Sequence, residues 1–322
     1  ESSEFEKKIP HLIVSKIEHE SILETCKDLE KANQASITYL DVDKDGVVNL
    51  KQLKNSLTKE TILVSIMEVN NETGVIEPIK EISKIIKEFK ESKIQTKNQN
   101  KYRLNDLKYP VFHTDAVQAL NVASGIKLAD LGVDFMTISG HKSYAPKGIA
   151  ALLISSIIKD FKEELLMPII TGGGQEFGFR ASTENVSGIV GLAKAIELIE
   201  ISQAKENIKL KNLKKTLQEG ILKTYSKAII NSPLNSTSSI LNVSFPNFTS
   251  EELIYKFDKY EIAISAGSAC SAKALQPSHV LKAMNLKDEL INSAIRISLG
   301  RENLISEVNY FLAKLPEILN KN

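Results

Sequence analysis

Short apolar runs rich in β-branched residues alternate with segments of helical periodicity over the first half of the chain. Strands are predicted at Leu12–Ile17, Ile37–Val42, Ile62–Val69, Val111–Thr114, Phe135–Ser139 and Ile149–Ile154. Helices are predicted between them, at Ser21–Lys31, Leu50–Leu57 and Pro78–Ser92. In the third helix Ile79, Ile82 and Ile86 recur at helical spacing. Strands that alternate with helices predict an α/β domain with a mainly parallel sheet.

The pattern changes after Glu184, where a long helical stretch runs to about Lys223. Shorter predicted elements follow it: strands Ser239–Ser244, Ile262–Ser265 and Ala294–Leu299, helices Ser250–Tyr260 and Ser278–Ala283, and a closing helix from Glu302. We therefore expect a large α/β domain over residues 1–203 and a smaller α+β domain over residues 204–322. Residues 93–109 are rich in Lys and Asn without periodicity, which predicts an exposed loop insertion.

Bulk composition excludes several classes of protein. The chain has 322 residues, a formal net charge of +1 and two cysteines. The balanced charge favours neither nucleic acid nor a membrane surface as a partner, and two cysteines make no disulfide framework. The longest nearly apolar run, residues 148–158, is far shorter than the roughly 20 residues of a membrane helix. The charged N-terminus lacks a signal-peptide core, so we expect an intracellular protein, cytoplasmic or in the mitochondrial matrix.

A lysine and an aspartate each follow a predicted strand. Lys142 comes after Phe135–Ser139, and Asp115 comes after Val111–Thr114. Ligands of open parallel sheets bind beyond the carboxyl ends of the strands. A lysine held there is suited to a Schiff base with a carbonyl cofactor, and an aspartate can pair with the ring nitrogen of pyridoxal phosphate. Taken singly, the alternatives are a surface lysine and a helix-capping aspartate.

Other polar residues lie near these positions or at other predicted strand ends. Gln118, one turn after Asp115, could donate to a phenolic oxygen of the cofactor, while Ser139 and His141 could bind its phosphate. Asn71 could present its amide to a substrate carboxylate or to the cofactor, although asparagine there is also a common turn former. Arg296 is suited to a bidentate contact with a carboxylate, with a structural ion pair as the alternative. No metal site is predicted.

The two cysteines differ in their surroundings. Cys26 shares an apolar helix face with Ile22 and Leu23, which predicts a core position. Cys270 lies in SAGSACSAKAL, a run of small residues that predicts an accessible loop. An accessible thiol can act as a nucleophile, and the alternative is a small buried side chain.

One apparent calcium motif is rejected. Residues 41–52, DVDKDGVVNLKQ, match the first half of an EF-hand loop but place Gln52 where calcium needs a bidentate glutamate. The preceding residues predict a strand, whereas an EF-hand needs a helix there. A polar turn between strand and helix is therefore predicted.

Several motifs, in this order, resemble one known family. They are IEHESIL, VSIMEVNNETG, HTDAVQAL, SGHKSYAPKG, GGGQEFGFRASTEN, SAGSACSAKALQPSHVLKAM and IRISLGR. Together they resemble the NifS/IscS-type cysteine desulfurases, members of the class V aminotransferase family. The resemblance covers nearly the whole chain and implies the pyridoxal-phosphate-dependent transferase fold of aspartate aminotransferase (fold type I).

The resemblance implies a pyridoxal 5'-phosphate site. The cofactor-binding residues it implies are Lys142, His19, Asp115, Gln118, Ser139, His141, Thr183 and Asn71. Among them, Lys142 would bind the cofactor covalently, His19 would stack on its ring, and Thr183 would reach the phosphate from a second subunit. A homodimer is therefore implied.

The implied substrate is L-cysteine. Arg296 and Asn71 would bind its carboxylate, and Lys142 or His19 would move its α-proton. Cys270 would accept the sulfur as a persulfide, with L-alanine as the other product. The sulfur would pass to an acceptor protein such as an iron–sulfur scaffold.

The sequence departs from the family pattern at several places. Members usually carry a further N-terminal segment with a phosphate-binding loop, which we expect this chain to lack. Ala145 and Ser182 stand where the family has glycine. Two alternatives to the desulfurase therefore stay open: a selenocysteine lyase, and a cofactor-poor fragment that acts only as a binding partner.

Overall fold

A six-stranded sheet forms the centre of the N-terminal part of the chain. A computed structural model describes residues 9–95, 109–120, 127–156, 166–267 and 277–320. The strands are β1 (His11–Ser15), β2 (Ser36–Leu40), β3 (Thr61–Ser65), β4 (Val111–Asp115), β5 (Phe135–Ser139) and β6 (Ala150–Ile154). Their order is β2-β1-β3-β4-β5-β6, parallel except for β6, which runs antiparallel to β5. The predicted mainly parallel sheet is confirmed.

Helices cover both faces of this sheet because the apolar side chains of its strands point alternately to either side. In β1, Ile13 belongs to the main core, to which α2 (Leu50–Ser56) and α3 (Ile79–Gln95) contribute. Its neighbour Val14 packs instead with Leu23 and Cys26 of α1 (Glu20–Lys31). A short helix, α4 (Leu128–Leu131), precedes β5.

A second, smaller sheet lies in the C-terminal part. Its strands are β7 (Ile229–Ile230), β8 (Ile240–Ser244) and β9 (Ala294–Ser298), paired antiparallel in that order. The helices around it are α7 (Ser250–Asp258), α8 (His279–Ala283), α9 (Asp288–Asn292) and α10 (Ile305–Ile318). A separate core forms there, in which Phe257 stacks on Phe311 at 4.9 Å between ring centroids.

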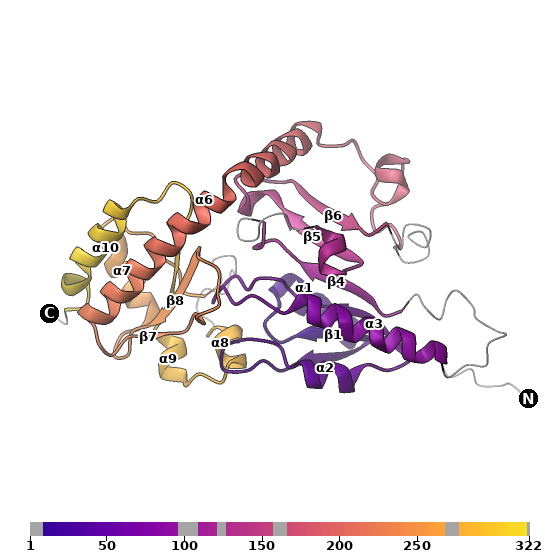
Figure 1. Cartoon of the computed structure of the whole chain (residues 1–322), viewed down its shortest axis with the longest axis horizontal. Helices are drawn as coiled ribbons and strands as arrows, with labels where there is room; N and C mark the ends of the chain where they lie inside the picture. The colour runs from indigo at the N-terminus through magenta and orange to yellow at the C-terminus, as the bar shows by residue number, and fades with distance from the viewer. Residues whose placement is uncertain (1–8, 96–108, 121–126, 157–165, 268–276, 321–322) are drawn as a thin grey trace, which may run out of the picture.

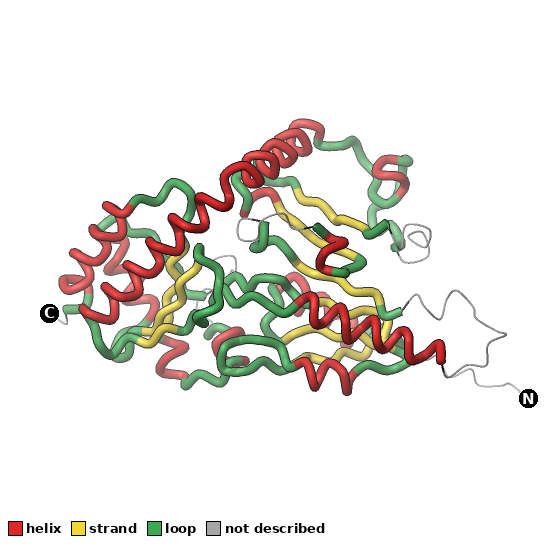
Figure 2. The backbone as a smooth tube through the Cα atoms, viewed as in Figure 1, coloured by secondary structure: helices red, strands yellow, loops and turns green. Residues whose placement is uncertain are grey.

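Helix α6 (Val186–Thr224) connects the two parts. Figure 1 shows it extending from beside β5 and β6 to α10, and Figure 2 shows the two groups of strands that it joins. Ile196 packs on the main core, and Leu210 belongs to the C-terminal core. The helix runs unbroken through residue 203, so the domain boundary at 203/204 stays a prediction.

Two predicted strands differ most from the structure. β3 ends at Ser65 rather than Val69, although the Ile66 and Glu68 N–H groups still donate to carbonyls of β4 at 3.1 and 2.9 Å. The predicted strand Ile262–Ser265 is wrong: it is reduced to one bridge between Ser265 and Arg296. A short apolar run forms a strand only where tertiary packing brings a partner strand alongside it.

The turn resembling a calcium loop adopts the predicted polar form. β2 precedes it and α2 follows it. The Asp43 carboxylate accepts hydrogen bonds from the N–H groups of Asp45 and Val47, at 2.9 and 3.0 Å. Across the part of the chain that the structure describes, no cluster of His, Cys, Asp or Glu side chains is arranged to hold a metal ion. Within the same residues, no helix is both long and apolar enough to cross a membrane.

Candidate active site

The carboxyl ends of four neighbouring parallel strands bring the predicted cofactor residues to one edge of the sheet. His19 follows β1, Asn71 follows β3, Asp115 ends β4 and Lys142 follows β5. These positions lie far apart in the chain, and the parallel topology gathers them. The site is therefore built on strand ends rather than on one local motif.

Lys142 ends a 3-10 turn, η2 (Gly140–Lys142), directly after β5, and is half-buried. Gly140 allows this sharp turn, since a Cβ there would lie 2.8 Å from the Ile149 side chain. Two residues beyond Lys142, Tyr144 adopts the left-handed region with φ at 59°. A bulky residue in that region is strained and needs outside support.

The C-terminal part supplies that support. The Arg301 N–H donates to the Tyr144 hydroxyl at 2.8 Å, and the Arg301 guanidinium lies 3.9 Å from the Tyr144 ring centroid. Lys209 of α6 donates in turn to the Arg301 carbonyl at 2.7 Å. The turn that carries Lys142 is thus held by residues of α6 and of the segment that follows β9. No pattern in the sequence indicates this contact.

Asp115 is a half-buried carboxylate that accepts a hydrogen bond from the Val117 N–H at 2.9 Å. Burial raises the pKa of this carboxyl, while the Val117 hydrogen bond and the charges of His19 and Lys142 lower it. His19 and Lys142 therefore both favour the ionised form of this carboxylate. A partly desolvated carboxylate is stabilised by a cationic partner.

His19 is the N-cap of α1. Its Nδ1 accepts from the Ser21 N–H at 3.2 Å and lies 2.9 Å from the Ser21 hydroxyl. Since Nδ1 acts as an acceptor, the neutral ring carries its proton on Nε2. The ring is thereby oriented, with Nε2 as a donor.

The predicted phosphate ligands lie beside each other. The Ser139 hydroxyl is 2.7 Å from Nδ1 of His141. Burial, followed by the charges of Lys142, His19 and Lys147, lowers the pKa of His141. Gln118 is half-buried in the turn that follows β4. A hydroxyl and an imidazole beside two lysines make suitable partners for an anionic group.

Asn71 and Arg296 are brought together as well. Nη1 of Arg296, in β9, donates to the backbone carbonyl of Asn71 at 2.9 Å, and Asn71 is 6% exposed. The next three carbonyls also accept hydrogen bonds from the C-terminal part. The donors are Asn242 Nδ2 to Glu72 at 3.2 Å, Ser232 Oγ to Thr73 at 2.6 Å and the Thr237 N–H to Gly74 at 2.8 Å. Residues 70–74, which we call the NNETG turn, therefore dock the second sheet against the site.

The structure tests the remaining two predicted residues only in part. Thr183 is exposed and precedes α6. Its neighbour Ser182, where the family has glycine, adopts φ at 93°, in the region that favours glycine. Cys270 lies outside the described residues, so its predicted role is untested.

Cys26 occupies the predicted core position. It is buried and free, packed with Val14 and Leu23. Burial, then the nearby charges of Glu18 and Glu30, raises its pKa to about 11. The thiol is therefore protonated at neutral pH and is no nucleophile.

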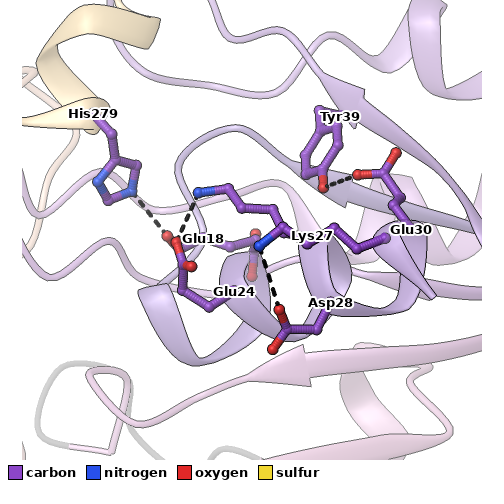
Figure 3. A network of polar contacts seen from close by, with 8 residues as sticks. Glu18, Glu24, Lys27, Asp28, Glu30, Tyr39 and His279 are labelled. Atoms are coloured by element: carbon purple, nitrogen blue, oxygen red, sulfur yellow. Dashed lines mark hydrogen bonds and ion pairs between the residues drawn. The ribbon is translucent and has the colours of Figure 1, made fainter.

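Burial perturbs three glutamates that no sequence pattern singled out. Burial raises the pKa of Glu68 to about 7, and those of Glu18 and Glu77 to about 8. One carboxyl oxygen of each has no hydrogen-bond partner among the described residues. Glu18 also accepts, at its backbone carbonyl, a hydrogen bond from His279 Nε2 at 3.0 Å, in the region drawn in Figure 3. A sequence pattern identifies these residues as acidic but does not reveal their raised pKa values, because burial depends on tertiary packing.

The arrangement fits pyridoxal phosphate. Lys142 supplies an amine, Asp115 a half-buried carboxylate for a protonated ring nitrogen, and Ser139 with His141 a phosphate-binding pair. The position of the half-buried Asp115 carboxylate, at the end of β4 beside the strand that Lys142 follows, is the observation that carries this fit.

A protein-family model and named relatives match nearly the whole chain. Residues 3–95 and 104–311 match the family described as Aminotransferase class-V. The chain is 42% identical over 318 residues to a protein of Clostridium botulinum named cysteine desulfurase IscS, covering 98% of this chain and 73% of that one.

Solved structures with a similar fold cover most of the chain. A structure titled NifS-like protein has a TM-score of 0.82 and 35% identity, covering 98% of this chain and 76% of its own. Another, titled SspA in complex with cysteine, has a TM-score of 0.70 and 33% identity, covering 92% and 75%. The chain belongs to the class-V aminotransferase family, with the fold of its NifS-like members.

Proposed function

We propose that this protein is a cysteine desulfurase, which uses pyridoxal phosphate to remove sulfur from L-cysteine and releases L-alanine. The observation that carries the proposal is the meeting of Lys142, Asp115 and His19 at neighbouring strand ends, within electrostatic range of one another. The identity to proteins named cysteine desulfurase supports it. When bound, the cofactor supplies an electron sink for the carbanion formed at the substrate α-carbon.

Lys142 moves the α-proton in this account. His19 is poorly suited to accept it, because its Nδ1 already accepts the Ser21 N–H and its Nε2 carries the proton. We assign His19 instead to stacking on the ring and to donating from Nε2. Asp115 would keep the ring nitrogen of the bound cofactor protonated, and Gln118 would donate to its phenolic oxygen.

The substrate carboxylate is assigned to Arg296 with Asn71. The Arg296 guanidinium already lies against the Asn71 backbone, so it approaches the site from β9 with one nitrogen anchored. A second guanidinium nitrogen then binds the carboxylate. Such an anchor orients the substrate at little entropic cost.

Cys270 is the proposed sulfur acceptor. Its thiolate attacks the substrate sulfur: a sulfur–sulfur bond forms, the substrate carbon–sulfur bond breaks, and the carbon takes up a proton, which yields L-alanine. Cys26 is excluded from this role by its burial and its raised pKa. The persulfide then passes its sulfur to an acceptor protein, for which we propose an iron–sulfur scaffold.

We propose a homodimer on the basis of exposed apolar side chains around the Gly-rich segment. Ile169 is 97% and Phe177 89% exposed, and Val186 and Val190 at the start of α6 are exposed as well. Large apolar side chains exposed in a group of nearby chain positions are expected at an interface. A second copy seated there would meet Thr183, which lies between Phe177 and Val186. Light scattering should give twice the chain mass, and Val190→Glu should lower it towards a monomer, whereas exposed Leu234→Glu, away from this surface, should not.

The proposed compartment is the reducing cytoplasm, because Cys26 is a free thiol. The relatives described above give no support to the mitochondrial matrix.

The test is a visible absorption spectrum with pyridoxal phosphate, before and after L-cysteine is added. We expect a band from the lysine-bound cofactor that L-cysteine alters and that Lys142→Ala lacks. Cys270→Ser should keep the band but form no persulfide, and Cys26→Ser should keep both. Turnover of selenocysteine but not cysteine would favour a selenocysteine lyase. No band at saturating pyridoxal phosphate would favour a non-catalytic binding partner.

A further inference from the structure

The buried carboxylate of Glu72 lies between the two described ends of the segment that contains Cys270. Glu72 belongs to the NNETG turn and is 2% exposed. Ser278, on the C-terminal side of residues 268–276, donates its hydroxyl to Glu72 Oε2 at 2.5 Å. On the N-terminal side, Gly267 packs so closely that a Cβ there would lie 3.2 Å from the same oxygen. One carboxylate thus hydrogen-bonds to one end and lies close to the other.

The backbone of Glu72 is itself fixed from both sheets. Its N–H donates to Asn70 Oδ1 at 2.9 Å, and its carbonyl accepts from Asn242 of β8 at 3.2 Å. Asn70 is fully buried and also donates to the Ile17 carbonyl at 3.0 Å. The Glu72 side chain therefore starts from a rigid backbone and has little freedom of orientation.

Further contacts tie the same two ends to the site. His279 donates to the carbonyl of Glu18, the residue before His19. Ser265 exchanges backbone hydrogen bonds with Arg296, at 3.2 and 2.6 Å. Each end of the segment is therefore joined to a residue that is, or adjoins, a proposed cofactor or substrate ligand. Glu18 and Arg296 each contact one end of the segment, whereas the Glu72 carboxylate lies beside both ends.

We propose that Glu72 is a positioning residue for sulfur transfer, whose carboxylate sets the spacing and orientation of the two ends of the Cys270 segment. The proposal rests on the proposed desulfurase function. Glu72 acts through Gly267 and Ser278 and touches neither substrate nor cofactor. Its loss should slow the transfer of sulfur to the protein without changing how the cofactor and L-cysteine bind.

The test compares Glu72→Ala, Glu72→Gln and Ser278→Ala with Glu77→Ala, a matched control that removes another buried glutamate five positions along the chain. Sulfur transfer is measured in a single turnover with labelled L-cysteine, and cofactor and substrate binding by visible absorption. We expect Glu72→Ala and Ser278→Ala to slow transfer roughly tenfold to hundredfold, the range expected on losing a hydrogen bond to a charged group. The cofactor band and the half-saturating L-cysteine concentration should stay within about twofold. Glu72→Gln, which keeps an acceptor oxygen, should restore most of the rate.

The double variant Glu72→Ala/Ser278→Ala should be no slower than the slower single variant, because both remove one hydrogen bond. Hydrogen–deuterium exchange on the cofactor-free protein gives a second readout. Amides on either side of residues 268–276 should lose protection in Glu72→Ala and keep it in Glu77→Ala.

Two results would overturn the proposal. In the first, Glu72→Ala transfers sulfur at the rate of Glu77→Ala. In the second, Glu72→Ala loses both the cofactor band and sulfur transfer. A wild-type protein with neither band nor transfer would refute the desulfurase function instead. In that case the exchange comparison still decides whether Glu72 fixes the two ends.

Discussion

A double-mutant cycle at Gly74 tests how the two parts of the molecule are docked. Gly74 ends the NNETG turn with φ at 76°, and its carbonyl accepts the Thr237 N–H at 2.8 Å. A Cβ at this position would lie 2.7 Å from Thr237 Cγ2 and 3.2 Å from Ile240 Cβ. Gly74→Ala should therefore combine backbone strain with a steric clash.

The expected cost has two parts. A left-handed backbone costs a residue with a Cβ about 1–2 kcal/mol, and overpacking a buried contact costs about 1–3 kcal/mol. Gly148→Ala isolates the first part, because Gly148 has φ at 83° and nothing within 4 Å of an added Cβ. We expect Gly148→Ala to lower the free energy of unfolding by about 1 kcal/mol and Gly74→Ala by about 3 kcal/mol.

Thr237→Ser provides the rescue. It deletes the methyl group that clashes and keeps the hydroxyl that contacts Ser239 at 2.9 Å. In the Thr237→Ser background, Gly74→Ala should cost about 1 kcal/mol less than in the wild type. The assay is urea denaturation followed by circular dichroism. Equal costs of Gly74→Ala in both backgrounds, or a Gly74→Ala cost no larger than that of Gly148→Ala, would refute this account of the docking.

Three further predictions concern stability. Ser182→Gly should raise the free energy of unfolding by about 1 kcal/mol, because φ at 93° strains serine but not glycine; a lower melting temperature would contradict this. Glu77 holds its proton in the folded state up to about pH 8 but loses it near its ordinary pKa when unfolded, so its contribution to stability falls as pH rises between these values. The free energy of unfolding of Glu77→Gln, relative to that of the wild type, should therefore rise from pH 5 to pH 9 in denaturation curves. A difference between the two proteins that stays constant with pH would exclude the raised pKa. Tyr144→Ala, which loses the contacts with Arg301, should cost about 1–2 kcal/mol and weaken pyridoxal phosphate retention in dialysis; unchanged retention would show that Arg301 does not support the Lys142 turn.

Periodicity predicted the sheet because each parallel strand carries its own apolar signal. β1, β2, β4 and β5 were each recognised from a local run of residues, and the parallel order then placed Asp115 and Lys142 at one edge. The segment 262–265 has a similar apolar pattern, yet it pairs only at Ser265. Whether a partner strand lies alongside depends on tertiary packing, which a local pattern does not contain.

The contacts that join the two parts could not be predicted in the same way. Asn242 and Glu72 lie 170 positions apart, and Arg296 and Asn71 lie 225 apart. No periodicity relates such pairs. Asn71 was expected to act through its amide, whereas its backbone carbonyl makes the contact that the structure shows. The raised pKa of Glu18 has the same origin, since it follows from burial rather than from neighbours in sequence.

The central claim is that Lys142 anchors a cofactor with which the protein removes sulfur from L-cysteine. The most direct measurement supplies sulfur-labelled L-cysteine to the protein saturated with pyridoxal phosphate, and follows protein-bound label and L-alanine together. We expect L-alanine and protein-bound label in equal amounts, with the label released by a thiol reductant. Lys142→Ala should form neither product. Products from Lys142→Ala at the wild-type rate, or none from a wild-type protein that binds the cofactor, would contradict it.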